Sequence, residues 1–240
     1  MIRIGCVPYL NAKPLIEGLE DVLLQPPSDL VALLVSKKLD VALLPAVEVL
    51  RLGLDYIPGI AIASPGKTDS VRLHHAVPVR QIRRVALDRN SRTSNMLTRI
   101  LLEERYKLTP TYVVRDPSKG LSFKAVDAAV TIGDTSFRPG RVPYLDLGSE
   151  WKKFTGKPFV YALWALRPGK PDAEAIAAML RASKKRGIAS IAAIARREAP
   201  RLGLTPAYCR RYLTRAIRFD LGPAERAGLK LFGAYAKERS

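Results

Sequence analysis

The chain has 240 residues and a formal net charge of +18, and 48% of its residues are hydrophobic, which is enough for one large domain or two small packed ones. No apolar run is long enough to span a bilayer, and the N-terminus does not have the unbroken apolar stretch of a secretion signal, so we expect a cytoplasmic protein with no membrane partner. The basic residues are scattered in short clusters without an aromatic platform or zinc-finger spacing, which favours an arginine-rich surface and no nucleic-acid partner.

Strand and helix patterns alternate through the first 45 residues. Strands are expected at 2–7, 22–24 and 40–45, with helices that begin at Asn11 and Ser28. The run at 40–45 is almost wholly apolar, which favours a central parallel strand that is buried on both faces. A β-α-β-α-β order of this kind predicts the α/β class.

A second α/β unit follows a polar, Gly- and Pro-containing hinge at 64–70. A strand is expected at 70–74, at the end of the first lobe, and the second unit then has strands at 84–87, 111–115 and 128–132 and a helix at 92–106. A further apolar strand ends near 164, and everything beyond Pro171 has a helical pattern. We therefore predict two lobes joined near 73–77 and 158–165, with lobe 1 formed by 1–75 plus 163–240 and lobe 2 by 76–162.

The stretch from Asp88 to Ser94 joins a strand to a helix through a polar turn. Ser91, Thr93 and Ser94 are good helix N-caps, because their hydroxyls can accept hydrogen bonds from first-turn amides. Those amides and the helix dipole also attract anions. With Arg92 beside them, these hydroxyls could seat a carboxylate or phosphate, or they could form an ordinary cap that touches no ligand.

Other strand ends carry polar residues where ligands gather in α/β sheets. Asn11 could bind a ligand or cap its own helix, and Asp134 could be a base, a hydroxyl acceptor or a helix cap. His74 and His75 are adjacent on a strand, so they point to opposite faces and cannot easily share a metal. Cys6 and Cys209 are lone thiols expected to be reduced.

The chain contains no phosphate-binding glycine motif, metal-ligand cluster or Ser-His-Asp set, so we expect neither a cofactor nor a metal. Two lobes with hydroxyls, amides and helix starts facing a cleft suit a small carboxylate. The protein could then be a binding protein or an enzyme built on the same scaffold, because fold alone does not choose between them.

Several phrases, taken in order, resemble the menaquinone biosynthesis enzymes of the futalosine route, and most closely the chorismate dehydratases. The phrases are Tyr9-Leu10-Asn11-Ala12-Lys13-Pro14-Leu15, Asp40-Val41-Ala42-Leu43-Leu44-Pro45, Asp88 to Ser94, Ile132-Gly133-Asp134, and Asp146-Leu147-Gly148 continuing to Trp164-Ala165. The sister branch of this family, the dihydroxynaphthoate synthases, carries a histidine where this chain has Gly133-Asp134, and this difference favours the dehydratase branch. The chain departs from the family pattern at Ala46, His74 and His75.

The resemblance implies a two-lobed, type 2 periplasmic-binding-protein-like fold with a ligand cleft, in a protein that is not exported. It also implies that the chain, a monomer or homodimer, removes water from chorismate to give 3-[(1-carboxyvinyl)oxy]benzoate. We assign Asn11 and Asp134 to orienting the reacting groups and expect the substrate's own enolpyruvyl carboxylate to take the proton. The residues assigned to substrate binding are Ser70, Ser91, Arg92, Thr93, Ser94 and Gly133. The alternatives are a non-catalytic carboxylate-binding protein and a basic nucleic-acid-binding protein.

Overall fold

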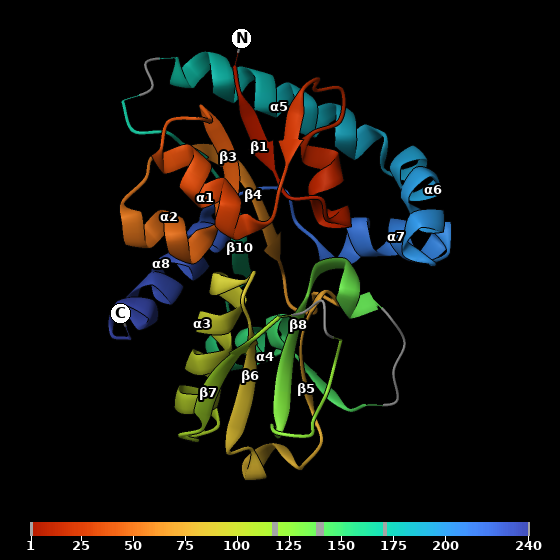
Figure 1. The fold of residues 1–240 in the computed structure, drawn as a ribbon. Helices are drawn as coiled ribbons and strands as arrows, with labels where there is room; N and C mark the ends of the chain where they lie inside the picture. Colours follow the sequence, from red (N-terminus) through yellow and green to blue (C-terminus); the bar gives the residue numbers. More distant parts are fainter. Residues whose placement is uncertain (1, 117–119, 138–141, 170–171, 240) are drawn as a thin grey trace.

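The computed structural model describes residues 2–116, 120–137, 142–169 and 172–239. In Figure 1 two lobes lie one above the other, and each is built on its own five-stranded sheet. The chain runs from the first lobe to the second after residue 64 and returns before residue 159.

The sheet of the first lobe has the strand order β2-β1-β3-β10-β4. Its strands are β1 (Ile4–Cys6), β2 (Val22–Leu24), β3 (Val41–Pro45), β4 (Tyr56–Ser64) and β10 (Phe159–Leu166). β3 lies in the middle, parallel to β1 and antiparallel to β10, and it is buried along its whole length. The central position predicted from its apolar run is confirmed, because a strand covered on both faces has no solvent side for polar residues.

The sheet of the second lobe repeats this plan in the order β7-β6-β8-β5-β9. Its strands are β5 (Val71–His75), β6 (Arg84–Asp88), β7 (Thr111–Arg115), β8 (Ala128–Ile132) and β9 (Tyr144–Asp146). β6 is parallel to β7 and β8, whereas β5 runs antiparallel to β8 and β9. Each sheet therefore contains one strand that runs antiparallel to both of its neighbours, β10 in the first sheet and β5 in the second.

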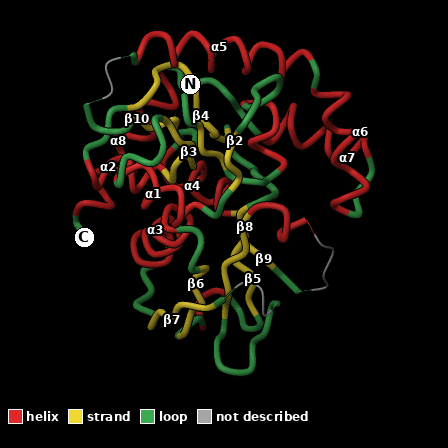
Figure 2. The backbone as a smooth tube through the Cα atoms, turned by 45° about the horizontal axis from the view of Figure 1, so that its top comes forward, coloured by secondary structure: helices red, strands yellow, loops and turns green. Residues whose placement is uncertain are grey.

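Helices surround both sheets, and Figure 2 shows α5 and α6 over the first lobe with α3 beside the second. The α-helices are α1 (Pro27–Val35), α2 (Ala46–Leu52), α3 (Arg92–Ile100), α4 (Leu147–Thr155), α5 (Ala173–Ala189), α6 (Ile191–Leu202), α7 (Pro206–Arg211) and α8 (Pro223–Lys237). Short 3₁₀ turns form η1 (Leu10–Leu15), η2 (Val79–Gln81) and η5 (Gly133–Phe137), and π turns form η3 (Leu101–Arg105) and η6 (Tyr212–Ala216).

Two apolar cores, one in each lobe, hold this arrangement together. The C-terminal helix α8 contributes Phe232 to the second core, where its ring centroid lies 4.9 Å from that of Phe159. Trp151 packs edge-on against Phe159 at 5.3 Å. The last helix therefore ties the returning strand β10 to the second lobe, since aromatic pairs of this geometry add to the gain from burial.

The predicted lobe boundaries at 75 and 162 do not follow the sheets. β5 belongs entirely to the second sheet, and β10 belongs entirely to the first. The corrected crossings lie at 65–70 and 156–158, before each of these strands. The alternating pattern of a strand shows which face is buried but does not show which sheet it joins.

Helix starts were predicted with mixed success. Thr205 caps α7, with its hydroxyl accepting from Tyr208 N at 3.2 Å, as expected for Thr followed by Pro. The N-caps expected at Asn11 and Ser28 are wrong, because η1 begins after Tyr9 and α1 begins after Pro26. Asn11 lies inside η1, and its side chain is therefore not committed to capping.

Candidate functional site

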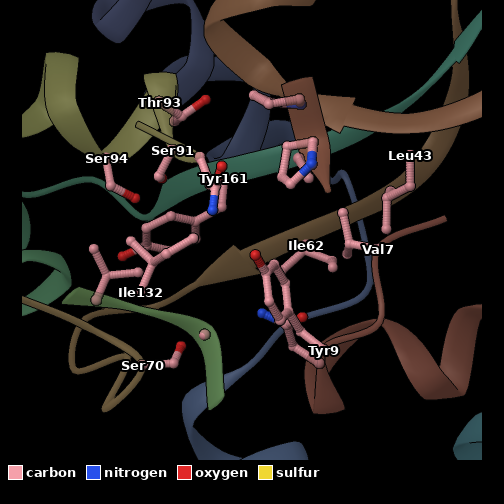
Figure 3. A pocket seen from close by; sticks show the side chains of 17 residues that line it. Val7, Tyr9, Leu43, Ile62, Ser70, Ser91, Thr93, Ser94, Ile132 and Tyr161 are labelled. Carbon is pink, nitrogen blue, oxygen red and sulfur yellow. The ribbon is translucent and has the colours of Figure 1, made fainter. Parts of the chain in front are cut away.

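A pocket lies between the lobes, where strand ends from both sheets meet (Figure 3). Its lining residues are Val7, Tyr9, Asn11, Pro27, Leu43, Pro45, Ile62, Ser70, Val71, Asn90, Ser91, Thr93, Ser94, Ile132, Gly133, Tyr161 and Ala162. Pockets for small organic ligands combine apolar walls with a few polar groups. The lining of this pocket has that composition and suits a small molecule.

Six of the eight predicted site residues line this pocket. They are Asn11, Ser70, Ser91, Thr93, Ser94 and Gly133. They come from η1, from the residue before β5, from the start of α3 and from the residue after β8. The fold therefore brings together four segments that are far apart in the sequence.

The start of α3 forms the hydroxyl-rich wall visible in Figure 3. Ser91 is the N-cap residue, but its side chain makes no capping hydrogen bond to the helix. Thr93 Oγ1 accepts from Val47 N at 3.2 Å, which links this helix to the opposite lobe. An uncapped N-terminus presents unpaired amides and the positive end of the helix dipole, so this wall can bind a carboxylate.

Asn11 forms another wall of the pocket from the first lobe. Its side-chain oxygen Oδ1 is buried and has no hydrogen-bond partner among the described residues. The nearby Tyr212 hydroxyl donates instead to Ser70 Oγ at 2.8 Å. A buried acceptor without a donor costs free energy, so this oxygen is available to a donor group of a ligand.

Two tyrosines that the sequence reasoning missed also line the pocket. Burial raises the pKa of Tyr9 to about 12, and Asp88 and Asp134 contribute to that rise. Burial likewise raises the pKa of Tyr161, and Asp146 adds to that rise, while hydrogen bonds with Ser64 and Thr68 oppose it. Both phenols are therefore neutral at physiological pH. Tyr9 stands in the phrase that carries Asn11, which was the available signal, but the strand pattern around Tyr161 gave no sign of its direction.

Arg92 and Asp134 do not line the pocket, and their predicted contact with the substrate is not supported by their positions. Arg92 donates instead to Glu48 Oε1 at 3.1 Å. Asp134 accepts from Leu10 N and from Arg201 Nη2, each at 3.0 Å. Each of these charged side chains forms an ion pair that holds it away from the pocket. The sequence does not reveal such a partner.

The described residues that line the pocket carry no formal charge. Asp88 lies behind the α3 wall, and burial raises the pKa of its carboxyl group. An anion in this pocket would be held by hydroxyls, amides and the α3 dipole. Such fixed dipoles bind charge without the desolvation cost of burying an arginine or lysine.

Within the ranges that the structure describes, no three His, Cys, Asp or Glu side chains gather as metal ligands. His74 is buried with Nε2 3.2 Å from Thr131 Oγ1, whereas His75 Nδ1 lies 2.9 Å from Val77 O. In the same ranges, no helix has the length and apolar character needed to cross a bilayer. The polar groups that the described pocket lining offers to a ligand are hydroxyls, amides and phenols.

Comparison with known sequences points to one family. A family model described as menaquinone biosynthesis matches residues 2–238. The chain is also 31% identical to the chorismate dehydratase of Thermus thermophilus over 257 aligned residues, covering 95% of this chain and 93% of that protein.

Comparison with solved structures identifies the fold. The chain is similar to protein AF1704 from Archaeoglobus fulgidus, with a TM-score of 0.78 and 18% identity, covering 99% of this chain and 97% of that one. It is also similar to the periplasmic aliphatic sulphonate binding protein SsuA from Escherichia coli, with a TM-score of 0.64 and 16% identity, covering 99% and 85%. The predicted periplasmic-binding-protein-like fold is confirmed.

Proposed function

The chain belongs to the menaquinone biosynthesis family, and from that premise we propose that it is an enzyme that removes water from chorismate. The observation that carries the proposal is a pocket between the lobes whose described lining is uncharged. In it the Asn11 amide oxygen, which has no partner among the described residues, shares one cavity with the start of α3, where Ser91 makes no capping hydrogen bond. The 31% identity to a chorismate dehydratase supports the same substrate. We place the reaction in the cytoplasm, on the futalosine route.

The proposed product is 3-[(1-carboxyvinyl)oxy]benzoate. Chorismate loses its 4-hydroxyl as water together with the proton on the neighbouring ring carbon, and the ring becomes aromatic. Aromatisation supplies the driving force, so the protein must mainly hold a dianion and assist one proton transfer. Groups that are already oriented toward the developing charge usually make the largest catalytic contribution.

We assign the two carboxylates to the hydroxyl-bearing walls of the pocket. Ser91, Thr93 and Ser94 surround the start of α3, whose dipole favours a negative group. Ser70 contributes a hydroxyl from the second lobe and is itself held by Tyr212 at 2.8 Å. Gly133 stays assigned to the binding wall, where its lack of a side chain leaves room for the Tyr9 ring beside the ligand.

Asn11 is assigned to the leaving hydroxyl. Its buried Oδ1 can accept the hydrogen of the substrate's 4-hydroxyl and so orient that group, and its Nδ2 can donate to the hydroxyl oxygen as negative charge develops there. Among the described residues, the pocket lining contains no histidine, lysine or carboxylate that could act as a base. We therefore assign removal of the ring proton to the substrate's own enolpyruvyl carboxylate, which then passes that proton to the departing hydroxide so that water leaves.

The test is incubation of the purified protein with chorismate, following the aromatic product by absorbance and mass. Asn11→Ala is expected to lower kcat by about 10- to 1,000-fold, the range seen when one oriented polar group is removed from a transition state. Gln81→Ala removes an amide from an exposed turn of the second lobe and serves as the matched control. Full turnover by Asn11→Ala contradicts the assigned role.

A non-catalytic carboxylate-binding protein is the competing proposal, because the fold is shared with substrate-binding proteins. It predicts tight binding of chorismate with no product after prolonged incubation. Turnover by the parent chain excludes it in the same experiment.

A further inference from the structure

The η1 turn that carries Asn11 is incomplete within its own lobe. A helix start leaves its first amides without acceptors, and Tyr9, the N-cap residue, offers no side-chain hydrogen bond. The Leu10 amide donates instead to Asp134 Oδ1 at 3.0 Å. Asp134 belongs to η5 of the opposite lobe, so the cap of this turn crosses the interface between the lobes.

The other end of η1 is fixed to its own lobe. Ser183 of α5 donates to Leu15 O at 3.0 Å. A Cβ at Gly187 would lie 1.9 Å from Pro14 O, which shows how closely α5 packs on this turn. The C-terminal end of η1 is therefore fixed within its own lobe, whereas the Leu10 amide at its N-terminal end finds its acceptor in the opposite lobe.

Asp134 is itself firmly placed. Gly133 N donates to Ser70 O at 2.8 Å, and Ser136 Oγ donates to the same oxygen at 3.2 Å, so η5 is fixed to the start of β5. The second carboxylate oxygen, Oδ2, accepts from Arg201 of α6 at 3.0 Å. One oxygen thus caps the turn that carries Asn11, and the other forms an ion pair with the first lobe.

We propose that Asp134 is a positioning residue that couples closure of the lobes to the orientation of Asn11. When the lobes meet, Oδ1 completes η1 and sets the backbone one residue before Asn11. When they separate, the Leu10 amide loses its acceptor and the start of η1 loosens. Asn11 is then held in the geometry needed for elimination only in the closed state. This inference rests on the proposed function.

Two substitutions at Asp134 separate positioning from proton transfer. Asp134→Asn keeps an oxygen that can accept from Leu10 N, whereas Asp134→Ala removes it. We expect kcat to fall by about 10- to 100-fold in Asp134→Ala, since small misplacements of a reacting group cost that much. We expect Asp134→Asn to recover most of that loss, to within about fivefold of the parent, because a neutral acceptor replaces a charged one.

Arg201→Gln tests the second oxygen. The Arg201 side chain is 50% exposed, so the ion pair contributes little, and we expect KM to rise by at most about fivefold while kcat changes less. Arg196→Gln on the same helix makes the same change in net charge at an exposed position and is the matched control. KM is expected to stay at the parent value in that control.

Hydrogen exchange at the Leu10 amide provides a readout that does not depend on turnover. Exchange is expected to accelerate in Asp134→Ala and to stay slow in Asp134→Asn, with the amides of β10 unchanged in both. Equal loss of kcat in the Ala and Asn variants, or unchanged exchange at Leu10 in Asp134→Ala, overturns the proposal. If the parent chain does not convert chorismate, the proposed function fails, while the exchange measurement still decides whether Asp134 caps η1.

Discussion

Replacing Gly133 with alanine is expected to hold the two lobes apart at the pocket. Gly133 has a φ of +58°, and a Cβ built on it would lie 2.9 Å from Tyr9 Cδ1 and 3.1 Å from Tyr9 Cγ. Tyr9 belongs to the opposite lobe, so the added methyl group would press on the ring across the interface. The neighbouring Asp134 cap would be displaced by the same movement.

Two costs contribute to this effect. The left-handed backbone costs a non-glycine residue roughly 1–2 kcal/mol. Adding a methyl group to a filled interface costs about 1–3 kcal/mol. Because the lobes can separate, we expect the cost of the added methyl group to disfavour the closed state. A cost of about 1–3 kcal/mol lowers kcat/KM by about 5- to 150-fold.

Gly53→Ala isolates the backbone cost. Gly53 has a nearly identical φ of +59° at the end of α2, but a Cβ there meets nothing within 4 Å. Steady-state kinetics with chorismate and thermal unfolding of both variants separate the two costs. Gly53→Ala is expected to lower Tm while kcat/KM stays within about twofold of the parent, because the change lies outside the interface. If both variants lose the same kcat/KM, contact with Tyr9 does not control closure.

Two further predictions concern charged groups outside the pocket. Arg92→Gln removes one of two guanidinium groups on the buried Glu48, since Arg51 still donates to it at 2.7 Å. Because the Arg92 side chain is 64% exposed, we expect a loss of at most about 1 kcal/mol in unfolding free energy and a kcat/KM within about threefold of the parent. A more than tenfold loss of kcat/KM would show that Arg92 contributes to substrate binding after all. The second prediction is that the unfolding free energy of His74→Gln falls less steeply than that of the parent as pH is lowered from 6.5 to 4. Burial and then Arg72 lower the pKa of His74 to about 4, so the unfolded state binds more protons below pH 6.5. The contribution of neutral His74 is present above pH 6.5 and is lost as pH falls toward 4. Allowing for solvent screening, we expect about 1–2 kcal/mol, measured as the difference between denaturant titrations of the two proteins. Parallel curves of unfolding free energy against pH for the parent and His74→Gln would refute this prediction.

The sequence by itself determined the elements and the chemical character of the site. The apolar run of β3, the Thr205-Pro206 helix start and the strands at 111–115 and 128–132 were all predicted, because each depends on a local pattern of burial or capping. The hydroxyls of the 91–94 turn were identified in the same way, and the structure places three of them in the pocket.

Only the tertiary structure decided where the long-range partners lie. The membership of β5 and β10 in their sheets, the pairing of Arg92 with Glu48 and the bond from Leu10 N to Asp134 all join residues distant in the sequence. A local pattern shows that a side chain is polar or half-buried. Which group it meets depends on how the two lobes pack, and that same packing makes Asp134, expected to orient the reacting groups, the cap of the turn that carries Asn11.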